Sequence, residues 1–393
     1  MKILFLNHNV KGRGTYVRCF NFAKHLAEFG HAVSLLTSTS EYRLTLKREV
    51  IDGVEVISLP DILGNRLRNG GLGPIDSFLR CMFVLNRQYD IVEMFDHRPA
   101  VLFPGLVSKY IQKKQMVVEW TDLHGTGGSL GNRPPRLQKL IRHYENFTER
   151  KSKLLGDQLV VISQGLKKLA LNMGIPAHRI SWIPGGADVD NIKPHNKTDA
   201  REKFGLPLNQ KLVGYTGYSH YDMDMLLKAI NILQQSRDDV WFVKTGAVLS
   251  DSLKAHLHDP KRLIELGFLS YPVFTKILPA MDAFIFPYAD KTINTGRWPN
   301  KLGDYMAAGR PTVTNRTGDI VDAFTKNNIG FMAAEDPEDM ANKMQILLSN
   351  DELAEQMGRN ARKAAEEIYD WRILSKKLES IFLNVSRPEV VGK

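Results

Sequence analysis

Apolar and polar residues alternate along the chain in a pattern typical of strands followed by helices. An apolar run over 3–6 leads to the break Gly12-Arg13-Gly14 and then to Thr15–Phe29, where apolar residues recur at helical spacing (Val17, Phe20, Ala23 and Leu26). Gly30 suits the end of that helix, and a second apolar run covers 32–37. Strand, glycine turn, helix and strand in this order predict a βαβ unit.

This alternation continues through the chain with one interruption. Strands are predicted at 54–59, 91–95, 116–120, 158–162 and 181–183, and helices at 78–85, 137–153 and 164–172, the last capped by Ser163. The pattern restarts with strands at 212–215, 240–245, 264–268, 283–287 and 312–314 and helices at 224–235, 273–280 and 300–308. Residues 187–210 are interpreted as an interdomain connection. We therefore expect an α/β protein with two doubly wound parallel-sheet domains and a ligand cleft between them.

Composition narrows the class of protein. A chain of 393 residues is too long for one ordinary core, and 43% hydrophobic with 24% charged residues excludes a mostly disordered chain. No apolar run reaches the roughly 18–20 residues that cross a bilayer. The run after Met1-Lys2 is too short for a signal-peptide core. Cys19 and Cys81 cannot form a disulfide framework, so we expect the reducing cytoplasm.

The formal net charge of +10 favours anionic partners. Basic residues are dense in 136–153, where they are interleaved with Leu140, Ile141 and Phe147. Two interpretations are open: a helix that lies on an anionic membrane without spanning it, or a solvated helix that packs its apolar stripe on the sheet. No nucleic-acid recognition motif is present, so a nucleic-acid partner is not expected.

The first glycine turn is a candidate anion site. Gly12 and Gly14 precede a helix N-terminus, where backbone amides favour negative charge. Val17 stands where a dinucleotide fingerprint has its third glycine, so NAD and FAD are not favoured. A plain tight turn is the other interpretation.

The segment 284–313 carries a more specific pattern. A strand ends at Pro287, a polar loop follows, and a helix begins near Asn300. Arg297, Asn300 and Lys301 around that helix N-terminus suit a diphosphate. Asp304, one turn later, is placed to accept both hydroxyls of a ribose. The residues alone leave open an ordinary surface acid that balances Lys301.

Residues 299–311, PNKLGDYMAAGRP, resemble the nucleotide-sugar motif of retaining GT-B glycosyltransferases of family 4, the glycosyl transferases group 1. That motif has two acids eight residues apart, the second followed by Met-Ala and then Gly-x-Pro-Val. The resemblance covers nearly the whole chain. Gly12–Thr37 is similar to the family's opening turn, helix and strand, Ser181–Asp190 to its linker entry, and Tyr369-Asp370-Trp371 to the aromatic residues before its last helix.

The resemblance implies a GT-B fold with Rossmann-like domains at 1–188 and 189–369. It implies a C-terminal helix at about 370–393 that packs back on the first domain. The nucleotide-sugar donor would then be bound by residues of two segments: Gly12 and Gly14 beside its phosphates, Asn300, Lys301 and Leu302 on the phosphates, and Asp304 on the ribose. Amides and cations would neutralise the leaving diphosphate, so neither a metal nor another cofactor is expected.

The donor side departs from the family's pattern at three positions. Gly296 stands where the family has its first Glu, which holds sugar hydroxyls. Tyr218 and Tyr221 stand at the family's Arg and Lys positions. The candidate replacements for these two cations are Lys244, Arg297 and His220.

The first domain departs as well. The family's sugar-facing His heads a His-Asp pair, whereas this chain has Thr121-Asp122 with His124 two residues later. Asp122 and His124 are the candidate catalytic residues, and the strand-end pair Asp96-His97 is a second candidate. A histidine at a strand end is more often structural.

We expect an enzyme that moves a hexose from a nucleotide-sugar to a hydroxyl acceptor, a glycan or a lipid-linked molecule, with retention of configuration. The alternatives are a non-catalytic nucleotide- or glycan-binding member of the fold and an NDP-sugar 2-epimerase. Asp222 and Asp224 have the spacing of a metal–diphosphate chelate, but they lie at a predicted helix start, where acids suit the dipole. The expected location is the cytoplasm, with the inner face of the membrane as its second option.

Overall fold

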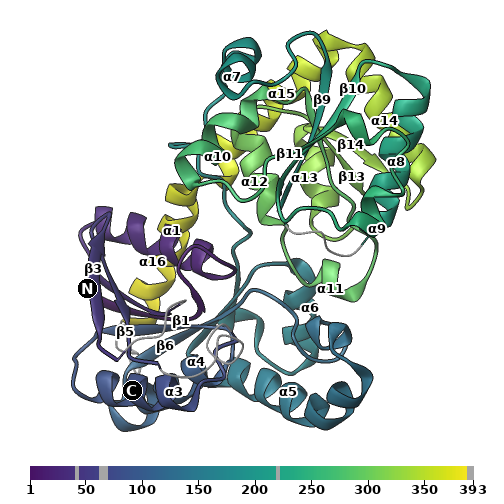
Figure 1. Cartoon of the computed structure of the whole chain (residues 1–393). Coiled ribbons are helices and arrows are strands. Elements are labelled where there is room, and N and C mark those ends of the chain that lie inside the picture. The colour runs from purple at the N-terminus through teal and green to yellow at the C-terminus, as the bar shows by residue number, and fades with distance from the viewer. Residues whose placement is uncertain (40–43, 62–69, 218–221, 387–393) are drawn as a thin grey trace. The chain divides into compact units, whose positions relative to one another are not determined.

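The computed structural model describes residues 1–39, 44–61, 70–217 and 222–386 (Figure 1). The chain forms two compact units. The first unit comprises Met1–Pro184 and the segment that begins at Trp371, and the second comprises Gly185–Asp370. Each unit is built on its own sheet with helices packed against it.

The first unit contains an eight-stranded sheet of order β3-β4-β2-β1-β5-β6-β7-β8. The edge strand β3 is antiparallel to its neighbour β4, and the other described strands pair in parallel. The inner strands are continuous apolar runs because both faces of a parallel sheet are covered. The strands are β1 (Lys2–Val10), β2 (Ala32–Ser38), β3 (Lys47–Ile51), β4 (Val54–Ser58), β5 (Ile91–Phe95), β6 (Gln115–Trp120), β7 (Gln158–Val161) and β8 (Ile180–Trp182).

The helices of the first unit begin where local signals favour it. Proline occupies the first helical position of α3, α4 and α5, and the Ser163 hydroxyl accepts the Leu166 N–H at 3.1 Å, as the sequence predicts. The helical segments are α1 (Tyr16–Glu28), α3 (Pro74–Leu85), α4 (Pro99–Leu106), η1 (Val107–Ile111), η2 (Ser129–Asn132), α5 (Pro135–Leu155), α6 (Gln164–Asn172), η3 (Ala177–Arg179) and α16 (Trp371–Ser386).

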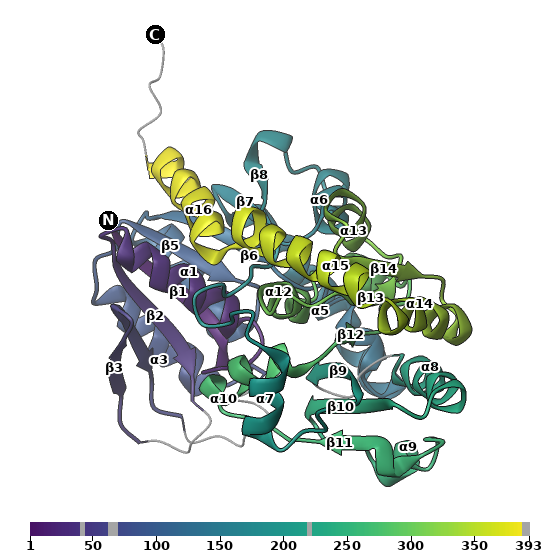
Figure 2. The same ribbon diagram turned by 90° about the horizontal axis from the view of Figure 1, so that it is seen from above.

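Helix α16 packs beside α1, although more than 340 residues separate them (Figure 2). The Trp371 and Phe22 rings lie 5.2 Å apart, and Phe382 lies 6.3 Å from Phe5 of β1. The face of α1 that enters this core comprises Tyr16, Cys19, Phe22, Ala23 and Leu26. Val17, part of the stripe that the sequence suggests, is exposed, because the buried face is shifted by one residue along the helix.

The second unit contains a six-stranded parallel sheet of order β11-β10-β9-β12-β13-β14. Its strands are β9 (Lys211–Gly217), β10 (Val240–Gly246), β11 (Leu263–Glu265), β12 (Ala283–Ile285), β13 (Thr312–Asn315) and β14 (Gly330–Ala333). Gly217 and Gly246 pair at the carboxyl ends of β9 and β10, and both have positive φ. A Cβ on Gly246 would lie 2.4 Å from the Gly217 oxygen, so this close approach needs glycine.

The helical segments of the second unit cover both faces of its sheet. They are α7 (Lys197–Phe204), α8 (Met223–Ser236), α9 (Asp251–Lys254), η4 (Pro260–Arg262), α10 (Tyr271–Ile277), η5 (Leu278–Ala280), α11 (Thr292–Thr295), α12 (Asn300–Ala307), α13 (Ile320–Asn327), α14 (Pro337–Ser349), α15 (Asp351–Ala364) and η6 (Ala365–Tyr369). Helix α7 corrects the sequence interpretation of 187–210 as a plain connection. Asn196 caps this helix and Gly205 ends it in the left-handed conformation.

Helix α5 has the reverse of the usual amphipathic arrangement. Its buried positions are polar or charged: Glu145, Thr148, Glu149, Ser152 and Lys153. Its exposed positions include Leu140 at 80%, Phe147 at 62% and Tyr144 at 47% exposure. The interpretation that this helix packs its apolar stripe on the sheet is therefore wrong.

Within the described ranges, no helix is both long enough and apolar enough to cross a bilayer.

Candidate active site

Three cations gather at the carboxyl ends of β9 and β10 in the second unit. Lys301 Nζ, from the first turn of α12, lies 4.0 Å from the centre of the Tyr215 ring. Lys244 Nζ, from β10, lies 5.7 Å from the same ring and donates to the Gly217 carbonyl at 3.3 Å. Arg297 donates to Asn294 Oδ1 at 2.6 Å. Three of the predicted donor residues are therefore brought together.

Two lysines of this cluster, Lys301 and Lys244, are not neutralised by a direct ion pair with any described residue. Among the described residues, none of the carboxylates lies within ion-pair distance of Lys301 or Lys244. Burial, followed by the charges of Arg297 and Lys244, lowers the pKa of Lys301 to about 7. Burial also lowers the pKa of Lys244. An anion bound here would restore the charge of Lys301 and offset the mutual repulsion of the three cations.

Asp304 lies on α12, one turn after Lys301, in a different environment. Burial, followed by the nearby charge of Asp188, raises the pKa of Asp304 to about 7. Asp188 accepts hydrogen bonds from the Asn191 N–H at 3.1 Å and from the Tyr271 hydroxyl. A half-buried acid beside a second acid is not the ordinary surface acid that the sequence left open. Perturbed carboxyls of this kind are common at binding sites.

The remaining predicted donor residues on α12 have different roles. Asn300 is exposed at the first position of the helix. The Leu302 side chain is fully buried, and its N–H donates to the Pro299 oxygen at 2.9 Å. The Leu302 N–H is thus already hydrogen-bonded within the chain, and its contact with the phosphates stays a prediction. Its role is to seat α12 in the core.

The departures from the family's donor pattern are only partly visible. Tyr218, His220 and Tyr221 lie outside the described residues. Gly296 ends α11 and supplies no side chain.

Asp222 binds Lys291 at 2.5 Å, whereas Asp224 binds Lys228 at 2.7 Å. Each of these acids thus has its own lysine, and no three His, Cys, Asp or Glu side chains in the described segments are grouped as metal ligands.

In the first unit, histidines from three segments converge at the carboxyl ends of adjacent strands. His8 comes from β1, His97 follows β5, and His124 follows β6. The ring centres of His97 and His124 are 5.1 Å apart, and those of His8 and His124 are 6.5 Å apart. In open α/β sheets this edge is where ligands bind.

Asp96 is the carboxylate that faces His124. Its Oδ2 lies 3.7 Å from His124 Nε2 and accepts the Thr121 hydroxyl at 2.8 Å. Asp96 has a φ of 66°, an unusual conformation for a residue with a Cβ. Burial opposes charge on both groups. Their mutual attraction outweighs it, so the pKa of Asp96 lies well below its usual range and that of His124 is raised.

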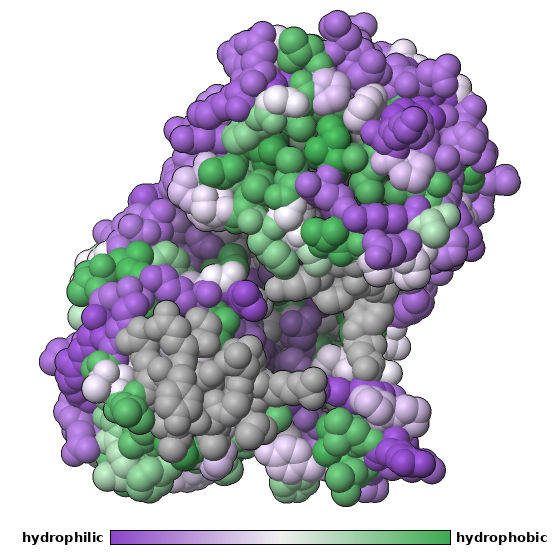
Figure 3. Space-filling model, viewed as in Figure 1, coloured by the Kyte–Doolittle hydropathy of each residue, from purple (hydrophilic) through white to green (hydrophobic). Residues whose placement is uncertain are grey.

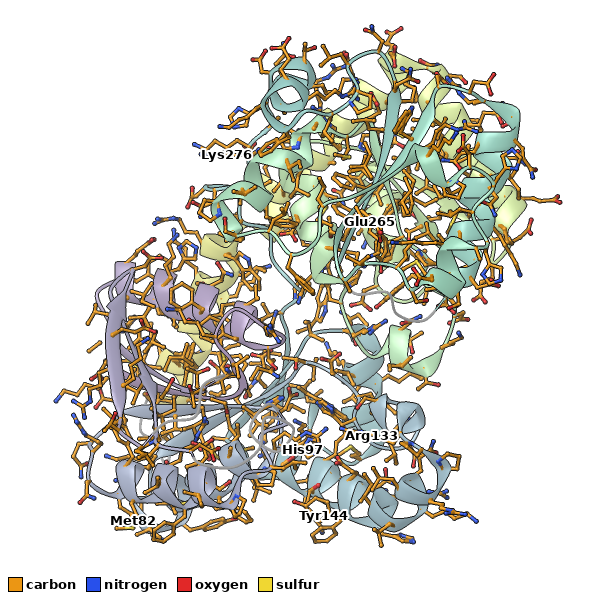
Figure 4. All side chains as sticks on the ribbon, in the orientation of Figure 1. Met82, His97, Arg133, Tyr144, Glu265 and Lys276 are labelled. Atoms are coloured by element: carbon orange, nitrogen blue, oxygen red, sulfur yellow. The ribbon has the colours of Figure 1, made fainter. Side chains whose placement is uncertain are left out.

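The neighbouring histidines stay neutral. Burial lowers the pKa of His8 to about 3 and that of His97 to about 4. His97 Nε2 lies 3.3 Å from a Glu145 oxygen, and Arg98 donates to the other oxygen of Glu145 at 2.6 Å. Figure 4 shows His97 inside the first unit, whereas Tyr144, which precedes Glu145 on α5, lies at the outer edge of that unit. His124 is therefore the ring of this cluster whose pKa is raised.

Three further predicted residues lie near this cluster in the sequence or at the same sheet edge. Asp122 is half-buried on the His124 loop, but Asp96 supplies the carboxylate at His124. Gly12 and Gly14 are exposed in the turn before α1, both with positive φ. A Cβ on Gly14 would lie 2.7 Å from Asn9 Oδ1, which accepts the Thr15 N–H at 2.8 Å. The turn therefore requires its glycine.

Sequence reasoning missed His8, Arg98 and Glu145. His8 lies within a strand and Glu145 within a helix, where neither stands out from its neighbours in a single sequence. Arg98 directly follows the candidate pair Asp96-His97 in the sequence, and this position is the signal by which it could have been predicted as a site residue.

Two family models match the chain. The model described as Glycosyltransferase Family 4 matches residues 12–191, and the one described as Glycosyl transferases group 1 matches residues 210–350. Each match falls largely on one of the two units. The chain therefore belongs to the glycosyltransferases.

Relatives support this membership. Glycosyltransferase YtcC of Bacillus subtilis is 27% identical over 276 residues, which cover 64% of this chain and 68% of that protein. N-acetyl-alpha-D-glucosaminyl L-malate synthase of Bacillus anthracis is 22% identical over 380 residues, or 94% of this chain and 93% of that one.

Solved structures agree on the GT-B fold. Sucrose-phosphate synthase from Thermosynechococcus elongatus matches with a TM-score of 0.76 at 14% identity, covering 98% of this chain and 99% of that one. WaaG, a glycosyltransferase involved in lipopolysaccharide biosynthesis, gives 0.72 at 16% identity over 97% and 99%. Anabaena Alr3699/HepE in complex with UDP and glucose gives 0.69 at 17% identity over 98% and 100%.

Proposed function

We propose that this glycosyltransferase transfers a hexose from a nucleotide-sugar to a hydroxyl of a glycan or lipid-linked acceptor, with retention of configuration and without a metal. The observation that carries the proposal is the arrangement on α12 and β10. Lys301 and Lys244 meet at the Tyr215 ring, and Asp304 lies one helical turn farther on. A nucleoside diphosphate has this same sequence of groups: phosphates with negative charge, then a ribose with two hydroxyl donors.

The charges fit the chemistry of the donor. When the bond between the sugar and the diphosphate breaks, negative charge develops on the leaving group. Lys301, Lys244 and Arg297 are positioned to stabilise that charge without rearrangement. Asp304 as a carboxylate would accept the ribose hydroxyls, and HepE, whose structure was solved with UDP and glucose, shares this fold.

The histidine cluster of the first unit supports a role on the sugar. The His124 ring can donate a hydrogen bond and the Asp96 carboxylate can accept one, so the pair suits the hydroxyls of a bound hexose. The neutral rings of His8 and His97 enclose His124 and limit its contact with water. Retention is proposed from the resemblance to the retaining family.

The outer face of α5 supports work at an anionic membrane. The two acids of this helix, Glu145 and Glu149, are both buried, whereas Arg136, Lys139, Arg142, Arg150 and Lys151 are exposed. These cations alternate with the exposed Leu140, Tyr144 and Phe147. Apolar patches next to polar ones are visible on the surface of the first unit (Figure 3). An apolar and cationic helix face matches an anionic bilayer surface.

A thermal-shift panel of UDP, GDP, ADP and CDP with their common sugar conjugates tests the donor, since a ligand that binds only the native state raises the melting temperature. The selected donor is then incubated with the protein, and released diphosphate and the anomeric proton of the sugar product are followed by NMR. Transfer or slow hydrolysis with the donor's own anomeric configuration supports the proposal. Binding without turnover would indicate a non-catalytic protein, and conversion of the sugar without diphosphate release would indicate an epimerase.

A further inference from the structure

The buried face of α5 carries hydrogen-bond acceptors directed at a single loop. Glu149 Oε1 accepts the Trp120 indole N–H at 3.1 Å and the His124 N–H at 2.9 Å, and Glu149 Oε2 accepts the Gly125 N–H at 2.7 Å. Asn146 Oδ1 accepts the Thr126 N–H at 2.8 Å. Three consecutive amides, those of residues 124–126, therefore point at two side chains of one helix.

The loop is shaped to make this approach. A Cβ on Gly125 would lie 2.3 Å from Asn146 Oδ1 and 2.8 Å from Glu149 Oε2. A Cβ on Gly128 would lie 2.0 Å from the Leu123 oxygen, which accepts the Ser129 N–H at 2.9 Å. Side chains at these positions would push the loop away from α5. The glycines and the helix acceptors are thus parts of the same arrangement.

The same helix also holds the residues that follow β5, on the other side of the histidine cluster. Glu145, one turn before Glu149, holds both His97 and Arg98. Arg98 in turn lies 3.3 Å from His124 Nδ1. None of these acceptors on α5 is directed at His124 Nε2, whose facing carboxylate is Asp96.

We propose that Glu149 is a positioning residue for the sugar-side site: by binding the backbone of residues 124 and 125 it holds the His124 ring against Asp96. Asn146 and Glu145 assist from the same helix face. This inference rests on the proposed function for its catalytic consequence, but not for its structural part. Glu149 does not touch the His124 ring and acts through the loop.

The charge of Glu149 gives the inference a second consequence. The groups around the His124 ring are Asp96, Arg98 and Glu149, with the neutral rings of His8 and His97. The negative charge of Glu149 supports the protonated form of His124. Its removal should therefore lower the pKa of His124, and a displaced loop should lower it further by moving the ring away from Asp96.

The test is Glu149→Gln, which keeps the shape but presents an NH₂ group to one of the three N–H donors. We expect kcat for donor turnover to fall about ten- to a hundredfold while the donor KM stays within about twofold, because the cations and the acid proposed to hold the diphosphate and the ribose lie in the second unit. Histidine ring NMR should show a lower pKa for His124 in the same variant. Asn146→Ala, which removes one acceptor without changing charge, should give a smaller loss of kcat.

His143→Gln is the matched control, since His143 is exposed on the same helix and its loss should change neither value. An unaltered His124 pKa together with an unaltered kcat in folded Glu149→Gln would overturn the inference. If neither the wild type nor the variants turn over any donor, the proposed function fails. The His124 pKa then still decides whether Glu149 positions the loop, also in Asn146→Ala if Glu149→Gln does not fold.

Discussion

At the scale of single residues, the two titrating groups on α12 should make donor binding depend on pH. Both Lys301 and Asp304 have pKa values of about 7 in the free protein. Below about pH 7 Asp304 is mostly protonated, so a donor that binds its carboxylate must displace that proton. Above about pH 7 Lys301 is mostly neutral, so a donor that binds its ammonium group requires Lys301 to take up a proton. Affinity for a nucleotide-sugar, whose diphosphate does not titrate in the neutral range, should therefore be greatest near pH 7.

The expected fall approaches about tenfold per pH unit on either side. Asp304→Asn should remove the acid limb and Lys301→Met the alkaline limb, each with weaker binding at pH 7. Calorimetric titrations between about pH 5.5 and 8.5 measure this directly. A wild-type affinity that does not vary over this range would show that neither group contacts the donor.

A cluster of buried charged side chains elsewhere in the first unit should contribute strongly to the free energy of unfolding. Arg18 of α1 binds Glu119 at 2.7 Å and donates to the carbonyls of Ile183 and Pro184 at 2.8 and 2.6 Å. Burial, followed by the charge of Glu119, raises the pKa of Glu93 well above its usual range. The two buried carboxyls, Glu93 and Glu119, are therefore accommodated by a proton on Glu93 and by the guanidinium of Arg18 beside Glu119.

Arg18→Met should lower the free energy of unfolding by about 3–5 kcal/mol, because it leaves Glu119 buried without its cation. The control is Arg372→Met, an exposed arginine paired with Glu28, with a loss of about 1 kcal/mol at most. Urea unfolding at neutral pH gives both values. Equal losses in the two variants would contradict the assigned role of Arg18.

At the scale of elements, α16 shows how a distant segment completes a core. Phe382 is fully buried against Phe5, whereas the next residue, Leu383, is 44% exposed. Phe382→Ala should lower the free energy of unfolding by about 3–5 kcal/mol, and Leu383→Ala should change it by no more than about 0.5 kcal/mol. Chemical denaturation of both variants checks this. Similar small effects would mean that α16 is not part of the cooperative core.

Helix α5 predicts a charge-dependent membrane contact. The wild type should sediment with vesicles that contain phosphatidylglycerol and not with phosphatidylcholine alone, since each basic residue near an anionic leaflet contributes about 1 kcal/mol. Higher salt should release it. The double variant Leu140→Ser with Phe147→Ser should lose most binding, and Leu208→Ser, at an exposed leucine of the second unit, should not. Negligible binding to both lipids at low salt would remove the membrane from the proposal.

At the scale of the whole molecule, the proposed reaction should not need a metal. The described part of the chain offers no cluster of three metal-ligating side chains, and three cations stand at the proposed donor site. We expect turnover of the selected donor to survive excess EDTA, with less than about a twofold change. If EDTA abolishes turnover and Mn²⁺ or Mg²⁺ restores it, Asp222 and Asp224 become the residues to mutate.

The α/β class, most of the strands and long helices, and the motif on α12 can be predicted from the sequence. These features are local: a hydrophobic period, a cap such as Ser163 or the run 299–311 can be recognised without knowing what packs against it. For the same reason β3, α4 and α7, which have weaker local signals, were missed.

Which side chains meet depends on three-dimensional packing and cannot be predicted from local sequence signals. Asp96, rather than Asp122, faces His124 because β5 and β6 are neighbours in the sheet and end at the same edge. Which face of α5 is buried also depends on packing. The spacing of its apolar residues predicts a helix. Its polar face is nevertheless the buried one, because Glu145 and Glu149 accept hydrogen bonds from backbone and side-chain donors of two loops. Periodicity locates the two faces of a helix. Only the partners of its polar groups decide which face is buried.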